Sequence, residues 1–185
     1  MPDFSAYWFH VLQIADASRI EGRLSPLARD HGDVAHFVLG EIQEAAPDLE
    51  HGVQEAERLL AAALRVNDID CLWSPCLGTE DGPYSYETHV RMGQIDESPD
   101  SLQVVVRQSL GAWRASVTTV EREHDTQYAW EALASLESAA QWSEEVCAGW
   151  LRVNSVSLDW QYREFSQMWW AKVELRRREV NRYGQ

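Results

Sequence analysis

Apolar residues recur at intervals of three and four positions along most of the chain, a spacing that predicts a mainly α-helical protein. The pattern is clearest after Pro47, where Asp48 can cap a helix that runs to Leu64. Three glutamates of this segment, Glu50, Glu55 and Glu57, fall away from the apolar positions and are expected on the solvent side. The apolar stripe itself consists of Leu49, Val53, Ala56, Leu59, Leu60, Ala63 and Leu64.

Helical spacing also predicts further helices over residues 26–46, 99–120, 126–154 and 157–182. We therefore expect a helical bundle of about five to six helices, folded as a single globular domain over residues 1–185. Two segments leave an alternative open. Residues 1–15 would suit a buried strand equally well, and in residues 100–121 the Val-Thr-Thr-Val run and Gly111 lower helix propensity.

One segment has the alternating pattern of a β-strand. Between residues 84 and 92, apolar and polar side chains follow one another with a period of two. A strand needs a neighbour, and the candidates are residues 69–73 upstream or 104–106 downstream. We expect a small β hairpin near residues 69–95, set in an irregular connection that is rich in Pro, Gly and Asp.

Composition places the chain among ordinary folded proteins, with 45% apolar and 25% charged residues. Every apolar run is too short to cross a bilayer, and the first residues lack the basic region of a secretory signal. Three cysteines at unremarkable spacing argue against a disulfide framework, so a cytoplasmic location is expected. No internal repeat is expected either.

Charge is the most informative global property, because the formal net charge is −14. Residues 1–97 carry −12 of it and residues 98–185 carry −2. Such an acidic surface disfavours nucleic acid and membranes as partners and accelerates encounter with a basic protein partner. An acidic surface that only keeps the protein soluble is the alternative. The uncompensated carboxylates lie between residues 30 and 57 and are Asp30, Asp33, Glu41, Glu44, Asp48, Glu50, Glu55 and Glu57.

Tryptophan is unusually frequent, with nine residues, and five of these lie after residue 140. Tryptophan fills cores and is also the residue most favoured at binding hot spots. Trp150 and Trp169 fall on the predicted apolar stripes and are expected in the core. Trp160 and Trp170 fall beside the stripes and are therefore candidate contacts to a partner.

The sequence indicates no cofactor, and its metal-binding signals are slight. Cys71 and Cys76 have the spacing of a zinc ligand pair, but no second pair follows at suitable spacing. Asp33, His36 and Glu44 recur at helical spacing, so a carboxylate and imidazole site between helices is geometrically conceivable. Ordinary pairing of charges on the surface explains these residues more simply.

One string, Arg29-Asp30-His31-Gly32-Asp33-Val34-Ala35-His36, resembles the signature of the HEPN helical ribonucleases, in which a polar residue follows an arginine and a histidine comes a few positions later. The resemblance implies an all-α, typically dimeric enzyme. It also implies that Arg29 and His36 polarise and protonate the scissile phosphate.

The leading hypothesis from the sequence is a non-catalytic acidic binding protein that docks on a basic protein partner. An inhibitor of the toxin-immunity or phage anti-defence type fits this class. The alternatives are a HEPN-like ribonuclease or metal-dependent helical enzyme, and a structural or assembly protein.

Overall fold

The computed structural model describes residues 6–13, 20–26, 49–76, 85–91, 99–120 and 125–175. Within them lie two α-helices and eleven β-strands, so the protein is mainly β, and the prediction of an all-α helical bundle is wrong. The elements before residue 95 are β1 (Ala6–Gln13), β2 (Ile20–Pro26), α1 (Leu49–Leu64), β3 (Asp68–Asp70), β4 (Ser74–Cys76) and β5 (Ser85–Arg91). The later elements are β6 (Ser101–Ser109), β7 (Ala112–Val120), β8 (Asp125–Leu133), α2 (Leu136–Leu151), β9 (Ser155–Ser157), β10 (Gln161–Arg163), the 3-10 turn η1 (Glu164–Ser166) and β11 (Met168–Glu174).

The predicted helix over residues 99–120 is a β hairpin formed by β6 and β7. Leu102, Val104 and Val106 alternate along β6 and are fully buried. The turn residues Leu110 and Gly111 both have positive φ angles, 52° and 80°. Two such residues between paired strands form the tight turn whose twist matches that of a hairpin, which explains why the chain reverses here.

Two further predicted helices are also corrected. The segment 126–154 divides into β8 and α2, because Ser135 begins α2 by accepting a hydrogen bond from the backbone N–H of Ser138. The segment predicted as a last helix over 157–182 contains β9, β10, η1 and β11 as far as it is described.

Two predicted elements are present. Helix α1 ends at Leu64, as predicted, and β5 lies where the alternating pattern predicted a strand. Strand β5 pairs with β1 and β4, and with neither of the two candidate neighbours. Strand β1 falls within residues 1–15, for which a strand was the alternative. The helix expected over residues 26–46 lies almost entirely outside the described residues.

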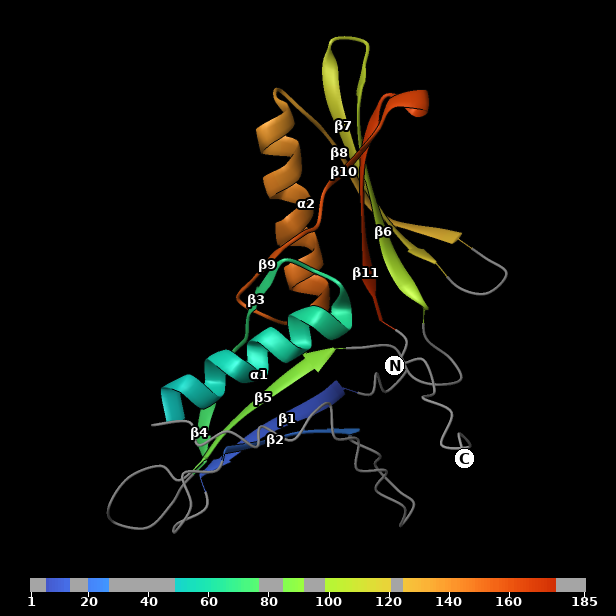
Figure 1. The fold of residues 1–185 in the computed structure, drawn as a ribbon. Coiled ribbons are helices and arrows are strands. Elements are labelled where there is room, and N and C mark those ends of the chain that lie inside the picture. The colour runs from blue at the N-terminus through green and yellow to red at the C-terminus, as the bar shows by residue number, and fades with distance from the viewer. Residues whose placement is uncertain are drawn as a thin grey trace, which may run out of the picture.

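The strands form two antiparallel sheets, each covered on one face by a helix (Figure 1). The four-stranded sheet has the order β2-β1-β5-β4, and α1 contacts β1, β2 and β5. The five-stranded sheet has the order β10-β11-β6-β7-β8, and α2 contacts β6, β7 and β8. Between them, β3 and β9 form a two-stranded ribbon that joins the two halves of the chain.

The two halves repeat one another, so the expectation of no internal repeat is wrong. Strands β1, β2, β4 and β5 occupy the same places in the first sheet as β6, β7, β10 and β11 in the second. The string Leu-Arg-Val-Asn ends both helices, at residues 64–67 and again at 151–154. In both copies the arginine takes a left-handed conformation, with φ angles of 56° and 62°.

A half-buried carboxylate holds the chain that follows the helix in the first half. Glu57 in α1 accepts hydrogen bonds from the backbone N–H of Cys71 at 2.9 Å and from the indole N–H of Trp73 at 2.8 Å. Both donors reach the same carboxylate oxygen, Oε1. Hydrogen bonds to a charged acceptor are stronger than neutral ones, so this arrangement, here named the Glu–Trp contact, fixes the segment after β3 against α1.

The second half has the same contact at the same spacing. Glu144 in α2 accepts hydrogen bonds from the backbone N–H of Leu158 at 2.9 Å and from the indole N–H of Trp160 at 3.2 Å. In both halves the donors lie 14 and 16 residues after the glutamate. The repeat therefore extends from the order of elements to individual hydrogen bonds.

Reciprocal hydrogen bonds link the two halves at the ribbon. The backbone N–H of Asn67 donates to the carbonyl of Ser157, and that of Asn154 donates to the carbonyl of Asp70, both at 2.8 Å. The side-chain amides of the two asparagines also donate to backbone carbonyls of the opposite half, at 3.0 and 3.3 Å. Each half thus satisfies polar groups of the other.

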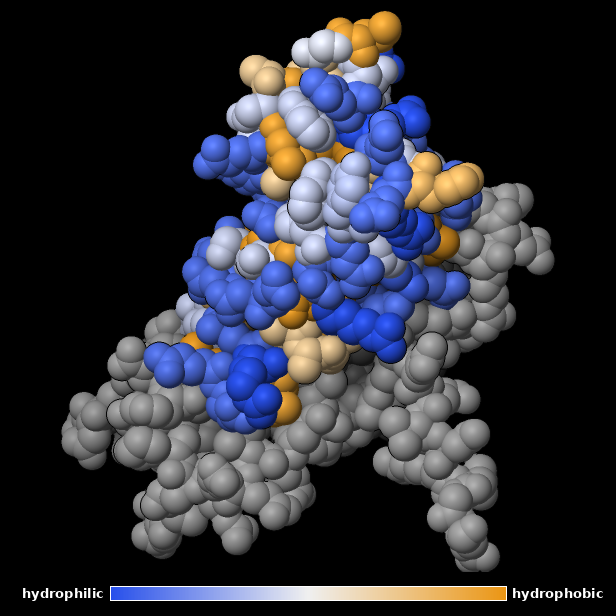
Figure 2. Space-filling model, turned by 45° about the horizontal axis from the view of Figure 1, so that its top comes forward, coloured by the Kyte–Doolittle hydropathy of each residue, from blue (hydrophilic) through white to orange (hydrophobic). Residues whose placement is uncertain are grey.

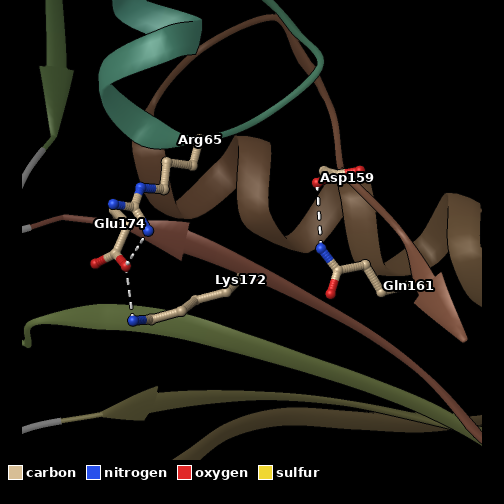
Figure 3. Close-up of polar contacts among 5 residues, drawn as sticks. All are labelled: Arg65, Asp159, Gln161, Lys172 and Glu174. Carbon is tan, nitrogen blue, oxygen red and sulfur yellow. Dashed lines mark hydrogen bonds and ion pairs between the residues drawn. The ribbon is translucent and has the colours of Figure 1, made fainter. Parts of the chain in front are cut away.

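An ion pair adds a second link between the halves (Figure 3). Nη1 of Arg65, the residue after α1, lies 3.6 Å from Oε1 of Glu174 at the end of β11. Glu174 also accepts a hydrogen bond of 2.7 Å from Lys172 on the same strand. Beneath these surface contacts, one hydrophobic cluster contains fully buried residues from both halves, including Leu60, Leu64, Leu102 and Leu151.

Candidate binding site

Most site residues predicted from the sequence lie outside the described residues. This applies to the side chains of Asp30, Asp33, Glu41, Glu44, Asp48, Glu50, Arg29 and His36. The acidic surface and the ribonuclease pair therefore stay predictions. The all-α fold that the ribonuclease resemblance implies is wrong for the described part of the chain.

The two described members of the acidic set are both engaged within the protein. Glu55 pairs with Arg58 on the surface of α1, and this hydrogen bond lowers the pKa of Glu55. Glu57 forms the Glu–Trp contact and is not a free surface charge. Both carboxylates already have partners within the protein, so neither is free to pair with a basic protein.

The two predicted tryptophan contacts have different surroundings. Trp160 packs against the core and donates to Glu144, so its role in the fold is structural. Trp170 is half-buried on the five-stranded sheet, where the guanidinium of Arg163 lies 4.0 Å from the centre of its ring. Only Trp170 remains a candidate contact to a partner.

No group of three or more potential metal ligands comes together among the described side chains. Cys71 and Cys147 are buried and unpaired. Burial raises the pKa of both thiols, that of Cys147 to about 12, with the carboxylates of Glu57 and Glu144 contributing respectively. Both thiols are therefore protonated and unreactive in the folded protein.

A different part of the molecule has the properties of a binding site. The turn between β6 and β7 and the turn between β10 and β11 project at the same end of the five-stranded sheet, away from α1 (Figure 1). Each turn presents a fully exposed apolar side chain, Leu110 at 95% and Phe165 at 104% relative exposure. In Figure 2 a group of hydrophobic residues stands at this end of the described surface, with residues of intermediate and hydrophilic character beside it.

A groove opens between the two turns because β6 continues past the start of β11. Met168, the first residue of β11, pairs with Arg107, and the two residues of β6 beyond it have no partner on that side. The resulting cavity has a volume of about 710 Å³. Its lining combines three aromatic rings with polar groups and includes Trp113, Tyr162, Trp169, Gln108, Gln167 and Arg107.

A row of positive charge crosses the sheet beside the groove. Directly paired residues in an antiparallel sheet share a face, so the register places Arg163, Met168, Arg107, Arg114 and Ala132 in one line on the face opposite α2. The three arginines are exposed. Neither Arg107 nor Arg114 has a hydrogen bond or an ion pair with any residue that the structure describes.

The next row of the same face is aromatic at both ends. It consists of Gln161, Trp170, Val105, Ser116 and Trp130, of which Trp130 is 62% exposed. The third row is Lys172, Gln103, Thr118 and Gln127. Among the paired strand residues of this face, carboxylates first occur in the fourth row, about 20 Å from the arginines at about 6.8 Å per two residues. Outside the paired rows, Asp159 and Glu164 flank β10 in the sequence.

We call this end, with Leu110, Phe165, the groove and the arginine row, the tip site. Comparison with protein-family models, curated proteins and solved structures finds no match for this chain. Neither of the two described helices has the length and apolar character that crossing a membrane requires.

Proposed function

We propose that the protein is a non-catalytic binding protein and that the tip site is its docking surface for another protein. Leu110 supports this proposal most strongly. Its left-handed backbone costs a non-glycine residue about 1 kcal/mol, and turns of this type favour Asn or Gly. Its side chain is 95% exposed and gains almost nothing from folding. Burial of Leu110 against a partner explains both features.

The residue types of the tip site support a protein partner. Trp, Tyr and Arg dominate the hot spots of protein–protein interfaces, and Phe is also enriched there. Trp113, Tyr162 and Trp169 line the groove, and the fully exposed Phe165 directly precedes the lining residue Ser166. The rings of Tyr162 and Trp169 lie in contact, with their centres 5.2 Å apart, and so present a rigid apolar surface.

The inhibitor role predicted from composition belongs to this functional class and stays a prediction. The tip site differs from the predicted acidic surface, because the charge it offers is positive. A cytoplasmic location also stays a prediction, and the unpaired thiols of Cys71 and Cys147 fit a reducing compartment.

The proposal is tested by comparing the proteins captured by three immobilised forms of the chain from a lysate of the source cells. The double variant Leu110→Asn/Phe165→Gln removes both apolar anchors, and Asn suits the turn, so the fold should be retained. The control is Leu72→Gln, since Leu72 is 55% exposed but belongs to the first half. Loss of two anchors worth about 2 kcal/mol each should weaken binding of a true partner by about three powers of ten.

A partner retained by the wild type and the control but absent from the double variant supports the proposal. If the double variant captures the same proteins in the same amounts as the wild type, the tip site is not the docking surface. Thermal unfolding of each form checks that the comparison is made between folded proteins.

A further inference from the structure

The groove of the tip site opens on the sheet face that α2 covers, and the arginine row lies on the other face. Val106 of β6 packs in one buried cluster with Ala139 of α2, which identifies the α2 face. Residues two apart in a strand share a face, and so do residues paired across strands. The register therefore places four lining side chains on the α2 face, namely Gln108, Trp113, Tyr162 and Trp169. A ligand in the groove meets these groups and does not have to reach the arginine row.

The groove has an aromatic wall on each side. Tyr162 and Trp169 form one wall, and Trp113 forms the other. The strands that carry the two indoles are two spacings apart, and Trp113 lies one row nearer the tip. At about 4.8 Å per strand and about 6.8 Å per row, their Cα atoms are about 12 Å apart. An α-helix with its side chains is about 10–12 Å wide, so a helix does not fit between the two rings.

The groove does not suit an added β-strand either. Strand β6 extends past the start of β11 by only two residues, Gln108 and Ser109. Strands in globular proteins are usually about 3–10 residues long, so an added strand would find too few backbone groups to pair with. A peptide in this groove is therefore recognised through its side chains and carbonyl groups, in a conformation that needs no ladder of backbone hydrogen bonds.

The polar groups of the groove are weighted toward donors. The indole N–H groups of Trp73 and Trp160 donate to glutamates within the protein. Those of Trp113 and Trp169 have no acceptor among the described residues, and neither does the side-chain amide of Gln108. In the described part of the chain, no carboxylate lines the groove. Because an indole N–H can only donate, the complementary ligand carries oxygen acceptors and few N–H groups.

A proline-rich segment meets these conditions. Proline has a backbone carbonyl but no N–H, and its ring is apolar. In the polyproline II conformation no hydrogen bonds form within the segment, so its carbonyl groups are free to accept from the groove. Such a segment rises about 3.1 Å per residue against about 1.5 Å in an α-helix, and is correspondingly slimmer. It is also preformed before binding, so it loses little conformational freedom in an aromatic groove.

We propose that the partner of the tip site presents a proline-rich segment in the polyproline II conformation. The segment lies between Trp113 and the Tyr162–Trp169 pair, and its carbonyl groups accept hydrogen bonds from the two indoles and from Gln108. The volume of about 710 Å³ suits a segment of a few residues. This inference rests on the proposed function and names the chemistry of the partner.

A random dodecapeptide library displayed on phage tests the inference without assuming a sequence. Selection is carried out on the wild type and on Tyr162→Ala/Gln108→Glu, which removes one ring and replaces a donor by a carboxylate that repels carbonyl oxygens. The matched control is Tyr128→Ala/Gln127→Glu on β8, since Tyr162 and Tyr128 are 50% and 52% exposed and both glutamines are exposed. We expect the wild type and the control to enrich peptides with two or more prolines close together, and the groove variant to lose them.

A selected peptide is then synthesised with a fluorescent label and titrated by fluorescence polarisation. Tyr162→Ala/Gln108→Glu should weaken its binding by at least about tenfold, as should replacement of its prolines by alanine. Gln108→Glu alone is the second variant, because it changes one exposed side chain and leaves the aromatic walls intact. Thermal unfolding checks that each variant is folded.

The outcomes separate this inference from the proposed function. Peptides without proline enrichment, or proline-rich peptides that bind all variants like the wild type, would overturn the inference. The proposed function would still stand if the lysate partner is lost from Leu110→Asn/Phe165→Gln. Sugars also stack on aromatic rings, so labelled chitotriose and maltohexaose form a second arm. Binding of either sugar that depends on Tyr162 and Gln108, without proline-rich peptides from the selection, would replace the peptide by a saccharide.

Discussion

The two halves of the chain hold a helix against a sheet with the same contacts, but they differ on the sheet face opposite the helix. Both halves have the Glu–Trp contact, the Leu-Arg-Val-Asn string and the ribbon strand that follows it. The two sheets can be aligned residue by residue through their strand order and register. In this alignment Glu21 of β2 takes the position of Arg114 of β7, and Glu87 of β5 takes the position of Trp170 of β11. The repeated positions are those that folding requires, and the positions that differ are where a binding surface can be built.

The largest loss of stability is expected at Leu64 and Leu151, which end the two helices and are both fully buried. Comparing their alanine variants tests whether the two halves are energetically equivalent. Substitution of a buried leucine by alanine costs 2–5 kcal/mol through lost burial and the cavity left behind, so each variant should lose about 3 kcal/mol of unfolding free energy. Urea denaturation followed by far-UV circular dichroism measures both.

Leu72→Ala is the control, because Leu72 is 55% exposed and should lose less than about 0.5 kcal/mol. A cost below 1 kcal/mol in Leu64→Ala together with the full cost in Leu151→Ala would show that only the second half is tightly packed. The structural repeat would then not be an energetic one.

A somewhat smaller effect is expected at the Glu–Trp contacts. Glu57→Ala and Glu144→Ala each leave a backbone N–H and an indole N–H without their charged acceptor. Hydrogen bonds to charged groups contribute about 1.5–3 kcal/mol, and some of the loss is recovered by water, so we expect about 2 kcal/mol at each site. The shorter indole bond in the first half predicts that Glu57→Ala loses slightly more.

Chemical denaturation of the two variants, with Glu57→Gln and Glu144→Gln beside them, separates charge from hydrogen bonding. The amide oxygen of Gln can still accept both bonds, so the Gln variants should lose about half as much. Equal stability of an Ala variant and the wild type would remove the Glu–Trp contact as a reason for the shared fold.

The elements that could be predicted from the sequence have a pattern that only one structure produces. Helix α1 buries one face, and its stripe combines steps of three and four. In β6, by contrast, Leu102 and Val106 are four residues apart, and this separation puts them on one face of a strand as well as of a helix. The steps of four in this segment fit both structures, so they could not exclude the hairpin.

The tip site could not be predicted because its residues are brought together by pairing alone. Arg107, Arg114 and Arg163 are isolated in the sequence and meet only through the register of four strands. Glu57 was assigned to solvent from its place opposite the stripe, although a segment 14 residues later covers it. The repeated Leu-Arg-Val-Asn string, with a glutamate before it and a tryptophan after it at the same spacing in both halves, was a signal of duplication in the sequence.

The smallest expected effect lies at a position where the halves differ inside the core. Thr88 in β5 is fully buried, and its hydroxyl has no hydrogen-bond partner among the described residues, whereas the equivalent strand β11 has the buried Ala171. Valine has the shape of threonine without the unsatisfied hydroxyl, so Thr88→Val should raise the unfolding free energy by about 1 kcal/mol in urea denaturation. Thr119→Val is the matched control, because the Thr119 hydroxyl donates to the carbonyl of Thr126 at 3.1 Å and its removal should cost about 0.5 kcal/mol. If Thr88→Val is destabilised like the control, the hydroxyl is satisfied in the folded protein, and the two core positions are not equivalent in their chemistry.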